Sequence, residues 1–142
     1  TVSEIISELT KIRRRMFAEF VVKDITYLSK GGRIGKVAGT LGSLLKICPI
    51  IRVNEDGVYE TAGKSMGFSR SLQMMLNQLH DKFGGVKIIV EIVHGLEEGT
   101  AKSVLEKIKK FSDVVQSAIV PVTAVLGVHT GPGLVGIIAY EI

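Results

Sequence analysis

Cysteine is almost absent from this chain of 142 residues, in which Cys48 is the only one. A single thiol excludes an internal disulfide and a metal cluster built on several cysteines, and it fits a reducing compartment. Cys48 lies in the apolar run 47–51, where no acid or histidine stands next to it. We therefore expect a small buried side chain and not a catalytic thiol.

The chain also lacks an apolar stretch that could span a bilayer. Its longest apolar runs, Val86–Val93 and Ala118–Val128, contain charge, Thr or Pro, or are too short. No signal or transit peptide is visible at the N-terminus, which also has no initiator Met. We expect a soluble, cytoplasmic protein without stable membrane insertion, and a sequence that is a segment of a longer protein or an expression product.

Basic residues are mostly dispersed along the sequence, apart from two short runs. The formal net charge is +4, and the two short basic runs, 11–15 and 107–110, fall on expected helix surfaces without interleaved aromatic residues. Such runs are typical of solvated helix faces and not of a track for phosphate groups. We expect no nucleic-acid partner.

Alternating helix and strand patterns predict a single α/β domain over residues 1–142. Packed helices on a mixed β-sheet, as a two-layer or three-layer sandwich, are the architecture that such alternation favours. We expect helices at 1–16, 34–46, 68–83 and 100–111 and a helical turn at 25–29, with strands at 17–22, 47–53, 58–61, 86–93, 114–118, 122–126 and 134–140.

Glycine is concentrated between Tyr27 and Ile50, in an otherwise apolar segment. Gly35, Gly39 and Gly42 follow the spacing i, i+4, i+7, which places them on one face of the helix expected at 34–46. Because each glycine costs a helix about 0.5–1 kcal/mol relative to alanine, a compensating contact is expected there. Two interpretations stay open, close packing on the sheet and a groove for a narrow apolar ligand.

A second glycine-rich segment, His129-Thr130-Gly131-Pro132-Gly133, is the best candidate for a binding site. An imidazole, a hydroxyl and backbone N–H groups exposed by the glycines can together hold an anion such as a carboxylate. The alternative is a Gly-Pro turn between two strands, with an incidental histidine.

Arg33 follows the Gly31-Gly32 pair, and it is either an anchor for an acidic partner or a charge at a helix start. Elsewhere the sequence shows no pair of acids, no Ser-His-Asp pattern and no metal-ligand spacing around His80 or His94. The pattern therefore favours a binding site over a catalytic one, and neither a metal nor another cofactor is expected.

Two motifs, in this order, resemble the DegV family of bacterial fatty-acid-binding proteins. The first is VKDITYLSKGGRIGK at 22–36, continued by LGSLLKICPI at 41–50, and the second is HTGPG at 129–133 followed by an apolar strand. The resemblance covers essentially the whole chain but only the second half of a typical member, whose two α/β domains hold the lipid between them.

The resemblance implies a non-enzymatic carrier that holds a long-chain fatty acid, such as palmitate or oleate, and presents its carboxylate to a separate fatty acid kinase. By motif position, His129 joins the polar network at the carboxylate, with Thr130 and Gly131 beside it, and Arg33 lies on the surface that docks the kinase. The Ser and Thr that usually hold the carboxylate belong to the N-terminal domain, which this sequence does not include.

The acyl tunnel is inferred from groove geometry and not from the motif. Ile34, Leu41 and Leu45 surround the glycine-bearing segment and are the residues expected to contact the acyl chain. Two other functions stay open: a small hydrolase or transferase domain that uses His129 as a base, and a purely structural domain whose glycine face packs against a sister domain.

Overall fold

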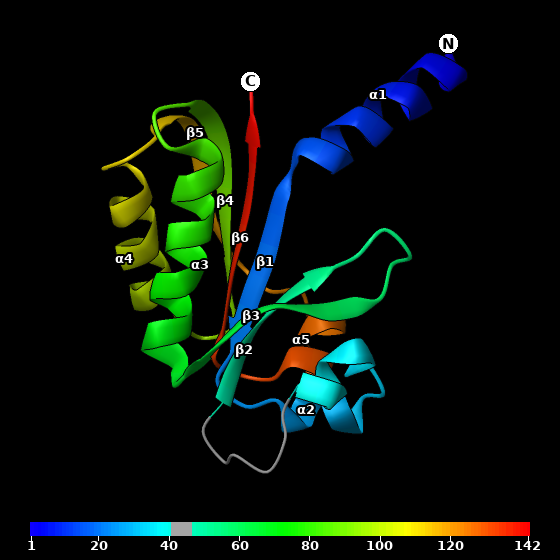
Figure 1. Cartoon of the computed structure of the whole chain (residues 1–142), viewed down its shortest axis with the longest axis vertical. Coiled ribbons are helices and arrows are strands. Elements are labelled where there is room, and N and C mark those ends of the chain that lie inside the picture. Colours follow the sequence, from blue (N-terminus) through cyan, green and yellow to red (C-terminus); the bar gives the residue numbers. More distant parts are fainter. Residues whose placement is uncertain (41–46) are drawn as a thin grey trace.

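The structure is a computed structural model that describes residues 1–40 and 47–142. A six-stranded sheet forms its centre, with the strand order β3-β2-β1-β6-β4-β5 (Figure 1). Only the β4–β5 pair is parallel, and the other neighbouring strands are antiparallel, which confirms the mixed sheet. The strands are β1 Phe17–Val22, β2 Ile47–Val53, β3 Tyr59–Met66, β4 Lys87–His94, β5 Asp113–Pro121 and β6 Leu134–Glu141.

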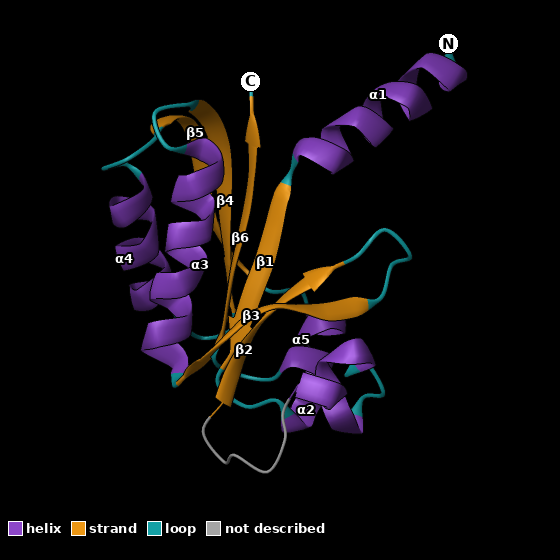
Figure 2. Cartoon of the chain, in the orientation of Figure 1, coloured by secondary structure: helices purple, strands orange, loops and turns teal. Residues whose placement is uncertain are grey.

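The helices lie on both faces of this sheet, which confirms the α/β sandwich (Figure 2). Neighbouring residues of β1 show the division, because Val21 belongs to one hydrophobic cluster and Val22 to the other. The helices are α1 Val2–Arg15, α2 Thr26–Lys30, the 3₁₀ helix η1 Gly35–Thr40, α3 Phe68–Phe83, α4 Glu98–Ile108 and α5 Ala124–Thr130.

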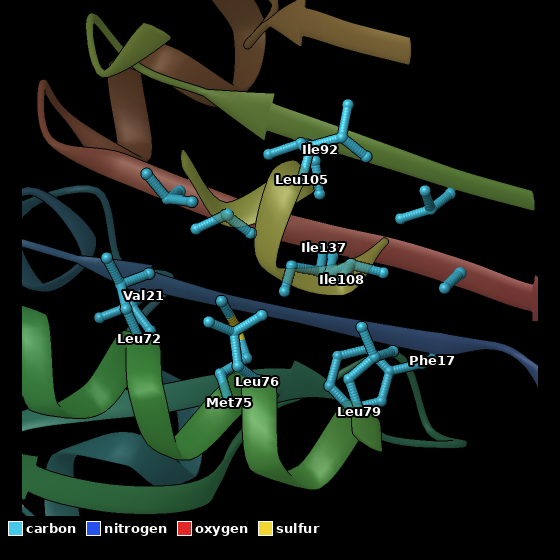
Figure 3. Packing of buried hydrophobic residues seen from close by; sticks show 14 of the residues in the cluster. Phe17, Val21, Leu72, Met75, Leu76, Leu79, Ile92, Leu105, Ile108 and Ile137 are labelled. Atoms are coloured by element: carbon cyan, nitrogen blue, oxygen red, sulfur yellow. The ribbon is translucent and has the colours of Figure 1, made fainter. Parts of the chain in front are cut away.

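The main core lies between the sheet and the helices α3 and α4 (Figure 3). Strand β1 contributes Phe17 and Val21 to it, and β6 contributes Ile137. Full burial of one such side chain contributes about 1.5–3 kcal/mol. The helical spacing of the sequence identifies the side chains that face this core, which are Leu72, Met75, Leu76, Leu79 and Phe83 of α3 and Ala101, Val104, Leu105 and Ile108 of α4.

A smaller cluster on the opposite face brings together α2, η1 and the beginning of β6. Its buried members are Val22, Leu28, Val37, Ile51 and Leu134. This cluster covers one end of the sheet, where α2 and α5 also lie side by side (Figure 1). It is the part of the fold that positions the candidate site.

Two expected elements differ from the structure. The helix expected at 34–46 is a 3₁₀ helix over Gly35–Thr40, and its remainder lies outside the described residues. The strand expected at 122–126 is wrong, because β5 ends at Pro121 and α5 begins at Ala124. Valine favours a strand, but this propensity depends on context, and here the segment packs beside α2 as a helix.

Helix α1 forms as expected but does not pack on the domain. Thr1 and Glu4 make the capping box that their spacing predicts. The α1 stripe, which consists of Val2, Ile5, Ile6 and Leu9, is nevertheless exposed, from 74% at Val2 to 59% at Leu9, and α1 contributes no buried residue. Figure 1 shows α1 extending away from the end of β1. The helical pattern therefore predicts the helix correctly, but no part of the chain that the structure describes covers its apolar face.

Among the described helices, none is both long and apolar enough to cross a membrane.

Candidate functional site

His129 lies in the last turn of α5 and not in a loop between two strands, which corrects the sequence-based expectation. The helix ends at Gly131, whose φ is +67°, and Gly133 follows with φ +90°. Both angles fall in the region that favours glycine, since a Cβ atom would be strained there. The two glycines thus turn the chain from α5 directly into β6.

The ring of His129 packs against Gly31, the first glycine of the pair that precedes Arg33. A Cβ atom added to Gly31 would lie closer than 3.0 Å to Nδ1 of His129, a separation that real Cβ atoms essentially never show. Gly31 therefore leaves the space that the imidazole occupies. The two motifs singled out from the sequence, almost one hundred residues apart, meet at this contact.

A second ring-on-glycine contact joins the same two helices. A Cβ atom on Gly131 would lie closer than 3.0 Å to three atoms of the Tyr27 ring. Tyr27 belongs to α2, and Gly131 caps α5. Each helix thus offers a ring to a glycine of the other, which fixes the position of His129 relative to the Gly31-Gly32 turn.

The strand ends hold the segment after His129 by backbone hydrogen bonds. The N–H of Gly133 donates to the carbonyl of Gly95 at 2.7 Å, and the N–H of Lys23 donates to the carbonyl of Gly133 at 3.1 Å. Gly95 also donates to Leu134 at 2.9 Å. The segment is therefore fixed between the ends of β1 and β4, and its geometry does not depend on a ligand.

Lys23, next to this segment, forms an ion pair with Glu97. The hydrogen bond from Lys23 is the main reason why the pKa of Glu97 lies below its usual value, and a 2.8 Å bond from the Thr100 hydroxyl adds to the effect. The ammonium group is thus matched by a carboxylate. It is a poor candidate for binding a second anion.

The Nδ1 atom of His129 is buried and has no hydrogen-bond partner among the described residues. A buried polar nitrogen without a partner is costly, but His129 as a whole is only partly buried, so the remainder of its ring is open to a ligand. Thr130 differs, because its hydroxyl donates to the carbonyl of Leu126 at 3.1 Å and the residue is only 2% exposed. The expected role of Thr130 as a donor to a ligand is therefore not supported by its geometry.

Arg33 is exposed at the edge of the same site. Its Nη1 donates to the carbonyl of Gly31 at 2.8 Å, and its backbone N–H donates to Leu28 at 2.9 Å. A guanidinium has five N–H donors, and among the described residues the Arg33 guanidinium makes only this one bond, which leaves its other donors without a partner there. The expected docking residue and the expected carboxylate residue thus both contact Gly31.

The residues expected to form an acyl tunnel are placed less favourably. Ile34 is partly buried and packs against the smaller cluster, so much of its side chain already contacts protein. Leu41 and Leu45 lie outside the described residues, as does Gly42. Gly35 has φ +51°, and a Cβ atom there would approach the carbonyl oxygen of Tyr59 to 2.6 Å. At Gly35, close packing on the sheet is therefore the interpretation that the structure supports.

Sequence reasoning missed an apolar surface on α5, beside His129. We define the α5 apolar surface as Val125, Leu126 and Val128, which are 76%, 45% and 71% exposed. Leu96, one residue after Gly95, is 88% exposed and has φ +61°. Neighbouring apolar side chains that are this exposed indicate a surface that something covers. Their spacing within a helix would have identified them if 122–126 had not been interpreted as a strand.

The arrangement suits binding better than catalysis. Within residues 1–40 and 47–142, His129 has no carboxylate or hydroxyl hydrogen-bonded to its ring, as a base–nucleophile pair requires. The same residues contain no group of His, Cys, Asp and Glu that could hold a metal ion. What the site offers is an imidazole nitrogen without a partner, a guanidinium and an apolar surface, a combination that fits an anion with an apolar tail.

Comparison with known proteins gives a consistent result. The family model described as "Uncharacterised protein, DegV family" matches residues 1–141. A DegV domain-containing protein of Clostridium perfringens is 39% identical over 134 residues, which are 94% of this chain and 48% of that protein. A protein of Thermotoga maritima named fatty acid-binding protein is 32% identical over 139 residues, covering 96% of this chain and 48% of the relative.

A solved structure shows the same fold. The structure titled as fatty acid binding of a DegV family protein from Thermus thermophilus superposes with a TM-score of 0.87 at 26% sequence identity. The superposition covers all of this chain and 51% of that one. This chain thus spans about half the length of the relatives that it matches.

Proposed function

This chain belongs to the DegV family, and we propose that it is one half of a carrier for a long-chain fatty acid such as palmitate or oleate. The fatty-acid carboxylate accepts a hydrogen bond from His129, and the acyl chain lies along neighbouring apolar side chains. One observation carries this proposal: the partly buried ring of His129 lies where the two glycine motifs meet, beside the exposed α5 apolar surface. The fatty-acid-binding names of relatives support it.

For the acyl chain, the α5 apolar surface is a better contact than the residues first expected. Val125 and Val128 are largely exposed, whereas Ile34 already packs in the smaller cluster. Each CH₂ group removed from water contributes about 0.8 kcal/mol, so the chain supplies most of the affinity. The imidazole then fixes which end of the ligand lies at the helix terminus.

The N-terminal domain of a two-domain protein supplies the other wall of this site. Two findings support this part of the proposal: the relatives are about twice as long as this chain, and the α1 stripe is exposed beside a well-packed domain. A 14-residue helix alone in water is only marginally stable, so α1 needs a partner that covers its apolar face. The covered surfaces would be the α1 stripe and the α5 apolar surface.

In this proposal the protein is not an enzyme, and a separate fatty acid kinase docks at Arg33. The support is the exposure of the Arg33 guanidinium and its hydrogen bond to Gly31, the glycine that the His129 ring also contacts. An acidic patch on the kinase would pair with it, and the bound carboxylate would then lie close to the docking surface. A hydrolase that uses His129 gains no support, because no nucleophile is hydrogen-bonded to that ring among the described residues.

Two variants of a chain extended at its N-terminus to the length of its relatives test the role of His129. His129→Ala removes the donor at the carboxylate, so palmitate affinity should fall about tenfold, the scale of one lost hydrogen bond to a charged group. Lys107→Ala changes an exposed residue near the end of α4 and serves as the control. Titration with fluorescent fatty acid measures both, and equal affinities of the two variants would contradict the proposed role.

A further inference from the structure

The two glycines that precede Arg33 suit their positions for different reasons. Gly32 has φ +69°, which favours glycine, and a Cβ atom there would meet nothing within 4 Å. Gly31 has φ −76° and ψ −5°, a right-handed helical conformation that other residues also adopt. Its backbone therefore does not require glycine. What Gly31 provides is space, because a Cβ atom there would lie closer than 3.0 Å to Nδ1 of His129.

This contact closes off the Nδ1 atom of His129. Nδ1 has almost no accessible surface and no hydrogen bond to a described residue. The hydrogen that glycine carries in place of Cβ lies in the direction of Nδ1, and a C–H group cannot accept a hydrogen bond. The carbonyl oxygen of Tyr27 lies on the same side of Gly31, 3.1 Å from the added Cβ, but it accepts the Gly31 N–H at 2.9 Å. Neither a ligand nor an acceptor among the described residues therefore reaches Nδ1.

The surroundings of the two ring nitrogens of His129 decide which of them carries the proton. A neutral imidazole has one N–H donor and one bare nitrogen. An N–H at Nδ1 would be a buried donor without an acceptor, which native proteins rarely contain, whereas a buried acceptor without a donor is more readily tolerated. Nε2 lies on the accessible part of the ring, and no described residue is hydrogen-bonded to it. The proton is therefore less costly on Nε2.

We propose that Gly31 is a positioning residue, which fixes His129 as the Nε2–H tautomer and thereby directs its one N–H donor toward the ligand. That the ligand is a fatty acid, whose carboxylate accepts this bond, rests on the proposed function. A donor that is oriented before the ligand arrives loses less freedom on binding. The second glycine motif thus supplies the ring, and the first determines which nitrogen of the ring binds.

Nitrogen NMR of the 142-residue chain, with isotope-labelled histidine, tests the tautomer. At about pH 8.5 imidazole is ordinarily neutral, and the couplings of the ring protons to the two nitrogens distinguish the two tautomers. The signals of His129, identified by their loss in His129→Ala, should be those of the Nε2–H tautomer alone. The Nδ1–H tautomer, or the averaged signals of a ring that exchanges between both forms, would overturn the proposal.

Gly31→Ala tests the positioning role itself. Its Cβ atom displaces the ring of His129, so Nδ1 meets water and the signals should become those of both tautomers in exchange. Gly127→Ala, on the same helix as His129, is the matched control, because its Cβ atom would make only an ordinary contact of 3.7 Å with Val122. It should leave the tautomer of His129 unchanged. A single Nε2–H tautomer in folded Gly31→Ala would contradict the role of Gly31, and if this variant did not fold, the tautomer of the parent chain would decide.

Two variants of the N-terminally extended chain connect the tautomer with ligand binding. The amide nitrogen of glutamine is as many bonds from the backbone as Nε2 of histidine, and that of asparagine is as many as Nδ1. His129→Gln should therefore bind palmitate within about threefold of the parent, whereas His129→Asn should lose about tenfold, as expected for His129→Ala. Equal affinities of the two variants, or the reverse order, would contradict donation from Nε2. If the parent did not bind palmitate, the proposed function would fail, whereas the tautomer and its dependence on Gly31 would stand.

Discussion

The helices next to the two ends of β1 have similar apolar patterns in the sequence but differ in how they pack on the domain. Beyond Val22, helices α2 and α5 are fixed to each other by two ring-on-glycine contacts and lie on a small core of their own. Before Phe17, α1 has an equally regular apolar stripe, but none of its residues is buried. Apolar periodicity thus predicts a helix at either end, whereas packing depends on a partner that the pattern does not specify.

The first prediction concerns a variant that disturbs the packing of α2 against α5, and it has the largest expected effect on stability. Gly131→Ala places a Cβ atom at φ +67° and against the Tyr27 ring. Strain at positive φ and overpacking together should lower the free energy of unfolding by about 4 kcal/mol. Urea denaturation measures the change.

Gly99→Ala is the matched control for that variant. Gly99 lies in α4, and a Cβ atom there meets nothing within 4 Å. Alanine should stabilise the chain by about 0.5–1 kcal/mol, as expected for a glycine in a helix. Similar stabilities of the two variants would show that the Tyr27–Gly131 contact is not as close as described.

Much of the well-packed end could be predicted from the sequence, and the particular contact could not. The glycine motifs around Gly31 and Gly131 were recognisable as special, because glycine between apolar residues is costly without a reason. Nothing in the spacing, however, indicated that His129 would fill the space beside Gly31. Such a contact depends on how β1 and β6 bring α2 and α5 together, and that is a property of the whole sheet.

The second prediction concerns the other end of β1. It states how the free energy of unfolding depends on pH through the carboxyl group of Glu19. Burial raises the pKa of Glu19 to about 7, against the ordinary value of 4.5 in the unfolded chain. The folded state therefore binds this proton more tightly. This difference in proton binding stabilises the folded state fully below pH 4.5. The stabilisation, up to about 3 kcal/mol of the free energy of unfolding, is lost as the pH rises through 7.

Urea denaturation between pH 4.5 and 8 checks this dependence. Glu19→Gln has no proton to lose, so its free energy of unfolding should not show that decrease and should exceed that of the parent chain at pH 8. Parallel pH profiles of the two proteins would mean that Glu19 is more hydrated than its 9% exposure indicates.

The burial of Glu19 could not be predicted from the sequence. In the run Phe17–Val21 the acid shares its face with Phe17 and Val21, so alternation would place it with core residues, while its charge indicates a solvated position. The outcome depends on Gln78 and Lys82, which α3 brings to the same place from about sixty residues away. Local pattern alone does not contain that information.

The third prediction tests the comparison with one substitution made at both ends. Leu28 is fully buried in the smaller cluster, whereas Leu9 on α1 is 59% exposed. Leu28→Ala should cost about 3 kcal/mol, and Leu9→Ala should change the stability of this chain by less than about 0.5 kcal/mol. In a chain extended to the length of its relatives, a larger cost of Leu9→Ala would indicate that the added segment covers α1.

The most direct test of the proposed function is native mass spectrometry with lipid extraction, on the 142-residue chain and on the N-terminally extended chain. A fatty acid that co-purifies with the extended chain, and with this chain only weakly or not at all, is the predicted result. It would agree with an apolar wall on α5 that needs a second domain to close it. Absence of ligand from both, even after incubation with palmitate and oleate, would contradict fatty-acid carriage.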